Sequence, residues 1–253
     1  MTPSVPSFRL DGKCALVTGA GRGIGRAIAE AYAASGAEVT LLARSRDEIE
    51  AVASDLRAAD LRATAVAADI TDVAAFDALL ADHPPVDVFV NNAGTNRPKP
   101  LSEVTEDDFD AVMSLNLRAA VFAAKAVTGQ MIAHGRKGSI INMSSQMGHV
   151  GAENRTLYCA SKWAIEGFTK ALAVEIGSYG IRVNTICPTF IETPMTTPFL
   201  EEPIFRQSVL SKIKLGRFGQ VDDITGAALF LASDASSLMT GSAMILDGGW
   251  TAD

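Results

Sequence analysis

Residues 13–36, KCALVTGAGRGIGRAIAEAYAASG, decide the fold of this chain. Residues 13–18 form a short apolar run typical of a buried strand, GAGRGIG follows at once, and RAIAEAYAASG has helical spacing and ends at Gly36. Glycines leave room where a backbone must turn tightly and approach a phosphate group at a helix N-terminus, where free N–H groups favour anions. The spacing is G-x-x-x-G-x-G, not the usual dinucleotide G-x-G-x-x-G, so a tight turn without a ligand remains an alternative.

The same alternation of strand and helix continues along the chain. VTLLAR, ATAVAADI and VDVFVNNAG are apolar runs, and helical segments at about 47–58 and 72–81 separate them. This pattern predicts a parallel, doubly wound α/β sheet within a single Rossmann-like domain over residues 1–253, preceded by a short tail at 1–11. Ligands bind such sheets at the carboxyl ends of the strands. The residues expected at that edge are Thr18, Ala43, Asp69, Asn92 and Ser145.

Composition narrows the class of partner. The chain has 253 residues, 48% of them apolar, with a formal net charge of -7, which argues against nucleic acid or an anionic membrane as the main partner. No apolar run approaches the roughly 20 residues of a membrane span, and the start resembles neither a signal nor a transit peptide. The cysteines and histidines are scattered, so we expect reduced thiols, no metal site and a cytoplasmic location. These residues are Cys14, Cys159, Cys187, His83, His134 and His149.

Residues 139–162, SIINMSSQMGHVGAENRTLYCASK, carry the candidate chemistry. Tyr158 and Lys162 lie four apart in a helical pattern and therefore share one face, while Ser145 follows a buried strand ending near Met143. A tyrosine pKa of about 10 must fall by about three units, roughly 4 kcal/mol, for the phenol to act as a base near neutrality. A neighbouring ammonium favours the phenolate. An ordinary amphipathic pair has the same spacing, so this interpretation depends on the rest of the chain.

The end of the second strand bears on the cofactor. An acidic residue there would accept hydrogen bonds from a free ribose 2′-hydroxyl, but the chain has Arg44 and Ser45, with Arg22 in the glycine loop. Two guanidinium groups and no carboxylate favour a 2′-phosphate, hence NADP(H) over NAD(H). The alternative is that Arg44 is a solvated loop residue or stacks on adenine, which leaves NAD(H) open.

Several polar residues have both a functional and a structural interpretation. Asp69 could accept from the adenine amino group or cap the next helix, although Thr71 and Asp72 suit the cap better. One of Asn91 and Asn92 could tie strands together rather than contact a ligand. A T-x-x-D capping box at 105–108 opens a long helix to about residue 134. Asn116 lies in the middle of that helix. Its side chain either makes a local structural hydrogen bond or holds an ordered water molecule.

The C-terminal third continues the pattern with one irregular segment. IRVNTIC predicts a buried strand, residues 221–232 an amphipathic helix and AMILDGGW a last strand. Between them, residues of about 190–215 contain prolines and apolar side chains, including Phe199, Leu200, Ile204 and Phe205. We predict a mobile lid over the active site, with a plain surface helix as the alternative.

Taken in order, the motifs resemble the short-chain dehydrogenase/reductase family over nearly the whole length. They are TGAGRGIG at 18–25, DI at 69–70, NNAG at 91–94, Asn116, Ser145, Tyr158-x-x-x-Lys162, Pro188 with Thr193, and DGG at 247–249. The resemblance implies a seven-stranded sheet and a homotetramer built on the helices carrying Asn116 and Tyr158 and on the last strand. Thr189 departs from the glycine that the family usually has after the proline.

The resemblance also implies roles for particular residues. Asn116, Ser145, Tyr158 and Lys162 would form a catalytic tetrad, with Tyr158 as acid/base, Lys162 lowering its pKa, Ser145 positioning the substrate oxygen and Asn116 anchoring water. The implied cofactor contacts are Gly19, Arg22, Gly23, Ile24, Gly25, Arg44, Ser45, Asp69, Ile70, Asn92, Ala93, Gly94, Tyr158, Lys162, Pro188, Ile191 and Thr193. The implied reaction interconverts a secondary alcohol and a ketone with NAD(P)(H).

The substrate is the least determined feature. Candidate contacts are Arg97, Gln146, His149, Arg155, Glu192 and Met195. Their polarity suits a sugar, polyol or sugar acid, and NNAGTNRPKP with the C-terminal residues resembles sugar-acid oxidoreductases of the gluconate 5-dehydrogenase type. Arg97 and Arg155 could instead be solvated loop cations. The other hypotheses are a 3-oxoacyl-thioester reductase and, in a different class, a catalytically idle dinucleotide-binding regulator.

Overall fold

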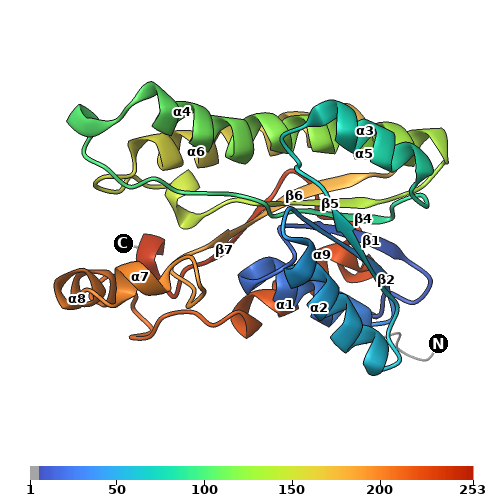
Figure 1. Cartoon of the computed structure of the whole chain (residues 1–253), viewed down its shortest axis with the longest axis horizontal. Coiled ribbons are helices and arrows are strands. Elements are labelled where there is room, and N and C mark those ends of the chain that lie inside the picture. Colours follow the sequence, from blue (N-terminus) through green and yellow to red (C-terminus); the bar gives the residue numbers. More distant parts are fainter. Residues whose placement is uncertain (1–5, 253) are drawn as a thin grey trace.

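The structure is a computed structural model that describes residues 6–252, and in them seven strands form one parallel sheet (Figure 1). The strand order is β3-β2-β1-β4-β5-β6-β7. The bounds are β1 Cys14–Thr18, β2 Glu38–Ala43, β3 Ala63–Ala67, β4 Val88–Asn91, β5 Ser139–Met143, β6 Arg182–Pro188 and β7 Ala243–Leu246. The predicted seven-stranded, doubly wound parallel sheet is therefore confirmed.

The sheet is buried on both faces, which explains why its strands are continuous apolar runs. Ala15 and Val17 of β1 pack into one apolar cluster, whereas Leu16 between them packs into a second cluster on the opposite face. Successive strand residues point to opposite faces, so both faces must be covered. Burying one such large aliphatic side chain stabilises the fold by about 1.5–3 kcal/mol.

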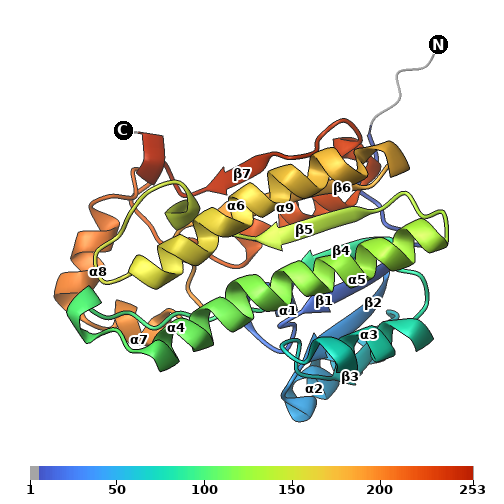
Figure 2. The same ribbon diagram turned by 90° about the horizontal axis from the view of Figure 1, so that it is seen from above.

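Helices form a layer on each side of this sheet. On one face lie α1 Gly23–Ala34, α2 Arg46–Ala58 and α9 Asp222–Ala232, and on the other lie α3 Val73–Asp82, α4 Glu106–Met113, α5 Ala120–Ala133 and α6 Thr156–Ile176 (Figures 1 and 2). Figure 2 shows α5 and α6 crossing the sheet as two long neighbouring helices. The strand arrowheads point toward the same edge, so all the carboxyl ends meet there.

The predicted helix at 105–134 contains an interruption. Its capping box is confirmed, since the Thr105 side chain accepts from the Asp108 N–H and the Asp108 carboxylate accepts from the Thr105 N–H. Between α4 and α5, however, Ser114–Ala119 is a π-helical segment and includes Asn116. Such segments recur at functional sites.

By length and composition alone, one helical stretch among the described residues, Glu106–Ala133, could cross a membrane. It packs against α3, α6 and β4 in the structure. Core helices of soluble proteins pass the same test, so length and composition alone do not show that this stretch spans a membrane.

The predicted lid segment forms two short helices, α7 Thr197–Leu200 and α8 Pro203–Leu210. Leu200, Val209 and Ile213 are buried in a third apolar cluster with Phe190 and Phe218, so only part of the segment's apolar surface is exposed. Its mobility stays a prediction.

The predicted N-terminal tail at 1–11 falls partly outside the described residues, which begin at residue 6. Leu10 belongs to the fold, because its side chain is fully buried and its N–H donates to the Ser35 carbonyl over 2.8 Å. The last residues of the predicted tail are thus part of the core.

Candidate active site

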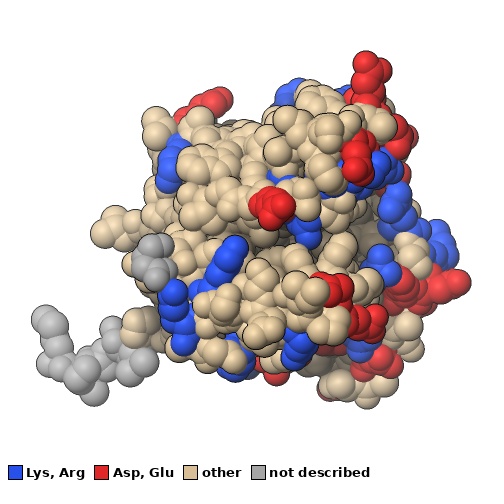
Figure 3. Space-filling model, turned by 90° about the vertical axis from the view of Figure 1, so that its left-hand side faces the viewer, with Lys and Arg blue, Asp and Glu red and all other residues tan. Residues whose placement is uncertain are grey.

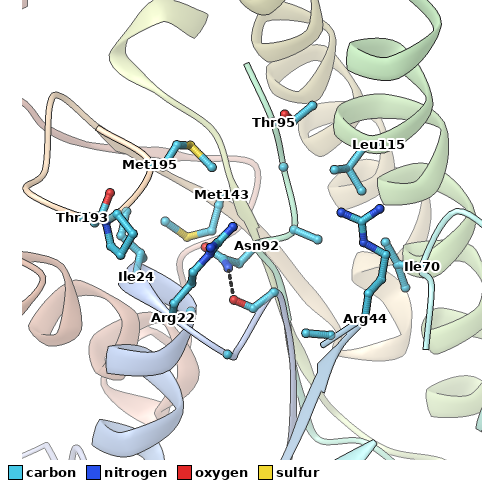
Figure 4. Close-up of a pocket in the computed structure, with 18 of the residues that line it drawn as sticks. Arg22, Ile24, Arg44, Ile70, Asn92, Thr95, Leu115, Met143, Thr193 and Met195 are labelled. Carbon is cyan, nitrogen blue, oxygen red and sulfur yellow. Dashed lines mark hydrogen bonds between the residues drawn. The ribbon is translucent and has the colours of Figure 1, made fainter. Parts of the chain in front are cut away.

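A cleft of about 800 Å³ opens at the carboxyl edge of the sheet, where the glycine loop and the ends of several strands meet. Every residue that the family resemblance assigns to the cofactor lines this cleft. Figure 4 shows Arg22, Ile24 and Thr193 on one side and Arg44 and Ile70 on the other, with Asn92 between them. The predicted edge residues Ala43, Asp69, Asn92 and Ser145 also line it.

The glycine loop is built so that no side chain fills its end of the cleft. Gly19 and Gly23 have positive φ angles of 65° and 56°, and a Cβ on Gly25 would lie 2.4 Å from the Gly19 carbonyl oxygen. Within the described chain, the Arg22 side chain makes no capping bond to α1, and the first turn of α1 has no acidic residue. The N–H groups and positive dipole of α1 therefore remain available to an anion, which fits a pyrophosphate.

Arg22 and Arg44 approach this region from different elements, but they are not alone. Glu48, in the first turn of α2, also lines the cleft and lies 3.8 Å from the Arg22 guanidinium. The expectation of two guanidinium groups and no carboxylate is wrong, because the helical turn after Arg44 brings Glu48 back against Gly21. Arg44 remains the guanidinium that faces the cleft without a salt bridge among residues 6–252.

Thr18 ends β1 at the carboxyl edge of the sheet, as expected, but its side chain does not line the cleft. Its hydroxyl donates to the Val90 carbonyl and accepts from the N–H groups of Asn92 and Ala93, tying β1 to β4. Asn91 is also structural, since it donates to Asn142 and to the Ala120 carbonyl.

The side chains of Asn92 and Asp69 make different hydrogen bonds. Asn92 donates to the Thr18 carbonyl over 2.9 Å and to the Gly19 carbonyl of the glycine loop over 3.3 Å, and it reaches the cleft (Figure 4). Asp69 accepts from the N–H and hydroxyl of Thr71, whereas Asp72 caps α3 by accepting from the Ala75 N–H. Asp72 is therefore the cap, and Asp69 stays at the cleft wall.

The candidate catalytic side chains meet at the other end of the cleft. Ser145 follows β5, and Tyr158 and Lys162 project from the first turns of α6. The Lys162 ammonium is buried, donates to the Met143 carbonyl over 2.8 Å and lies 5.5 Å from the centre of the Tyr158 ring. The Lys162 ammonium therefore lies between the end of β5 and the ring of Tyr158.

The pKa values of these groups differ from the sequence expectation. Burial raises the pKa of Tyr158, the Ser145 hydroxyl counteracts that increase through a hydrogen bond, and Arg155 also opposes it. Burial also lowers the pKa of Lys162 to about 8, and the expected lowering of the Tyr158 pKa by Lys162 stays a prediction. Desolvation disfavours the charged form of both groups. Tyr158 is thus held as a neutral phenol near neutrality.

Asn116 is held by local structural bonds. Its oxygen accepts from the Thr95 N–H over 2.8 Å, and its amide donates to the Thr95 carbonyl and to the Ser161 hydroxyl. It does not line the cleft, but it fixes the loop after β4 against α6. This arrangement matches the local-bond alternative, and a role for Asn116 in holding water stays a proposal.

The family model described as Enoyl-(Acyl carrier protein) reductase matches residues 19–251. The chain belongs to the short-chain dehydrogenase/reductase family. This short-chain dehydrogenase/reductase is 41% identical over 249 residues to D-threitol dehydrogenase of Mycolicibacterium smegmatis, covering 96% of this chain and 95% of the relative. It is 39% identical over 245 residues to L-xylulose reductase of Bos taurus, covering 97% and 99%.

Solved structures agree with this assignment. A gluconate 5-dehydrogenase from Burkholderia cenocepacia, in complex with NADP and tartrate, superimposes with a TM-score of 0.92 at 36% identity, covering 97% of this chain and 98% of that one. The resemblance drawn from the motifs is confirmed, and the chain is an oxidoreductase.

The predicted substrate contacts of this short-chain dehydrogenase/reductase divide into two groups. Arg97 and Met195 line the cleft, but the Arg97 guanidinium is engaged by Asp107 and Asp108. It is therefore an ion-paired residue at an exposed position of the loop.

The other four candidates do not line the cleft. Arg155 is buried beneath the rings of Phe199 and Phe205, and Glu192 accepts from Gln220. Gln146 is buried and accepts from the Ser145 hydroxyl. These four side chains therefore lie outside the cleft wall, and a contact between any of them and a substrate stays a prediction.

His149 also turns away from the cleft. Its Nε2 lies 3.4 Å from the Cys187 sulfur and 3.7 Å from a carboxylate oxygen of Glu166. His149 and Cys187 are thus in contact although the cysteines and histidines are scattered in the sequence.

Sequence reasoning missed two hydroxyl groups in the cleft of this short-chain dehydrogenase/reductase. Ser144 and Thr189 line it, and their buried hydroxyl oxygens have no hydrogen-bond partner in the described part of the chain. The departure from glycine at Thr189 was the available signal. Buried polar groups normally find partners, so these hydroxyls are available to a polar ligand.

Lys162→Met tests the burial of the ammonium. The folded pKa of about 8 lies below the ordinary 10.5, so the folded state binds fewer protons between these values. Wild-type stability should therefore increase relative to Lys162→Met as pH increases from 8 toward 10.5, by about 3 kcal/mol at most. Denaturant unfolding of both proteins between pH 7 and 10 measures this difference.

Lys170→Met, at an exposed position of α6, controls for the loss of a charge from the same helix. A stability difference between wild type and Lys162→Met that does not change with pH would contradict a buried, desolvated Lys162.

Proposed function

We propose that the protein is an NAD(P)(H)-dependent oxidoreductase that interconverts a secondary alcohol and a ketone. The observation that carries this proposal is the meeting of Ser145, Tyr158 and Lys162 in the same cleft as the glycine loop. A nicotinamide dinucleotide supplies hydride transfer when bound. The open N-terminus of α1, the small residues after β4 and the two arginines would hold it.

The protein's own residues handle the proton and the orientation of the substrate. The Ser145 hydroxyl holds the reacting oxygen, and the Tyr158 phenol gives a proton to that oxygen in reduction or takes one from it in oxidation. The raised pKa of Tyr158 supports its role as the acid of the reductive direction, because the phenol is protonated near neutrality. Lys162 would hold the nicotinamide ribose next to this phenol.

We propose a sugar, polyol or sugar acid as the substrate. The unpartnered hydroxyl of Thr189 in the cleft supports a substrate that carries hydroxyl groups. The names of the relatives, which act on threitol, xylulose and gluconate, support the same class.

A 3-oxoacyl-thioester reductase is the second candidate, because the matching family model is described as an acyl-carrier-protein reductase. Docking of an acidic carrier requires a basic surface. Figure 3 views the carboxyl edge of the sheet, where acidic and basic side chains lie next to one another. This mixture favours the small polar substrate.

We also propose a cytoplasmic homotetramer. Exposed aromatic side chains on the two long helical stretches, Phe109, Phe122 and Trp163, and the exposed Ile245 on the edge strand β7 support burial against other copies. The three free cysteines support a reducing compartment.

Absorbance of the reduced nicotinamide with a panel of ketoses, polyols, sugar acids and 3-oxoacyl thioesters tests the substrate class. We expect the highest kcat/KM for a polyhydroxylated compound. Thr189→Val should lower that kcat/KM about 2- to 10-fold, the worth of one neutral hydrogen bond, while 3-oxoacyl thioesters are less affected. Faster turnover of 3-oxoacyl thioesters by wild type would favour the second candidate.

Arg44→Ala tests the preference for NADP(H). If Arg44 binds the 2′-phosphate, its loss should weaken NADPH binding about 10- to 100-fold, the worth of a charge-assisted hydrogen bond, with little change for NADH. Glu48→Gln is the matched variant in the same wall. It should strengthen NADPH binding because it removes a carboxylate that repels the negative 2′-phosphate. Equal weakening of both cofactors by Arg44→Ala, measured by fluorescence titration, would instead support stacking on adenine.

A further inference from the structure

Three potential metal ligands converge behind Ser144 and Ser145, and none of the three lines the cleft. His149 ends the short turn Gln146–Gly148, Glu166 lies on α6 and Cys187 lies on β6. The Cys187 sulfur is 3.2 Å from Glu166 Oε1 and 3.4 Å from His149 Nε2, and His149 Nε2 is 3.7 Å from Glu166 Oε1. All three ligand atoms lie within 4.8 Å of one another.

These distances fit one tetrahedral ion. Zinc bonds of about 2.3 Å to sulfur and about 2.0–2.2 Å to nitrogen and oxygen, at tetrahedral angles, separate the ligand atoms by about 3.3–3.6 Å. The three measured separations bracket this range. A metal could therefore bind with small side-chain adjustments and no rearrangement of the backbone.

The charge and burial of the cluster also favour a cation. The Glu166 side chain is 7% exposed and accepts from the Cys187 thiol and the Thr185 hydroxyl. A buried carboxylate is costly unless a positive group compensates it. Among residues 6–252, the ammonium that interacts with it is that of the more distant Lys162, which is committed to the Met143 carbonyl, while the nearer His149 is a potential metal ligand.

A neighbouring hydroxyl is a second observation that points to a ligand. Ser144 is 5% exposed, and its hydroxyl has no hydrogen-bond partner of normal geometry among the described residues, although it lies near enough to Cys187 to lower the pKa of that thiol. A Cβ on Gly148 would lie 2.9 Å from this hydroxyl and 3.2 Å from Glu166, so the hydroxyl borders the cluster. It could accept a hydrogen bond from a water molecule in the fourth position.

We propose that His149, Glu166 and Cys187 form a binding site for a divalent transition-metal ion of the zinc type, with water as the fourth ligand. One nitrogen, one sulfur and one carboxylate ligand match zinc, whereas magnesium and calcium prefer oxygen ligands alone. His149, with 26% of its side chain exposed, provides the path of entry.

The site would act on the catalytic groups through the backbone. Glu166 follows Tyr158 and Lys162 at successive four-residue steps on α6, and His149 lies four residues after Ser145. A bound ion would cross-link the turn after Ser145 to α6 and β6. It would therefore stabilise the alignment of Ser145 with Lys162, and none of the three ligands needs to touch the substrate.

Cobalt and zinc titrations of the full-length protein test this inference, since Co²⁺ reports its ligands by absorbance. After treatment with a chelator, we expect one Co²⁺ per chain with a thiolate charge-transfer band and the visible bands of a four-coordinate ion, displaced by Zn²⁺. Cys187→Ser and His149→Ala should each weaken Zn²⁺ binding by more than about 10- to 100-fold, the effect of removing even an outer partner of a metal site. Zn²⁺ should raise the Tm of wild type but not that of Cys187→Ser or His149→Ala.

The matched controls are Cys14→Ser and His134→Ala, which remove the same residue types far from the cluster and should bind Zn²⁺ as wild type does. His149→Ala removes a partly exposed side chain, so it keeps the test valid if Cys187→Ser fails to fold. Absence of tight Zn²⁺ binding by wild type, absence of a thiolate band, or equal binding by His149→Ala would each overturn the inference. None of these readouts depends on turnover, so they are separate from the tests of the proposed function.

Discussion

The parallel direction of all seven strands is the constraint on which the rest of the structure depends. It brings the carboxyl ends of β1 to β6 to one edge, so that residues far apart in the chain share one cleft. It also requires helical connections that cover both faces, and the apolar runs of the strands are the result. The glycine loop after β1 and the hydroxyl after β5 occupy equivalent positions along this edge, one suited to an anion and the other to a reacting oxygen.

The chemistry of the cleft depends on burying groups that prefer water. Lys162 loses hydration and keeps a single carbonyl partner, which lowers its pKa to about 8, while the Tyr158 phenol is held neutral. The π-helical turn that carries Asn116 orders the loop opposite them through Thr95. Burial thus shifts the pKa values of two groups that line one cleft, as is common at functional sites.

The fold and the cleft wall were predictable, because strand runs and glycine motifs act through backbone geometry that local sequence determines. Arg44, Asn92 and Tyr158 lie where their positions at strand ends and on α6 placed them. The neighbours of a side chain across the fold were not predictable. Glu48 returns to the cleft through one helical turn, and His149 meets Cys187 only because β6 pairs with β5. The contacts of Arg155 with Phe199 and Phe205 depend on how α7 and α8 pack, and the irregular sequence of that segment does not predict this packing.

Tyr158→Phe most directly tests the central claim, that this phenol transfers the proton in an oxidoreductase reaction. Turnover and NADPH binding would be measured on the same samples, with Tyr179→Phe, an exposed tyrosine after α6, as the control. The account predicts that turnover falls by at least about 10²- to 10⁴-fold while NADPH affinity and Tm stay close to wild type. Retained turnover, or a variant that no longer folds, would contradict the catalytic assignment. NADPH binding without turnover of any substrate by wild type would point to a dinucleotide-binding regulator instead.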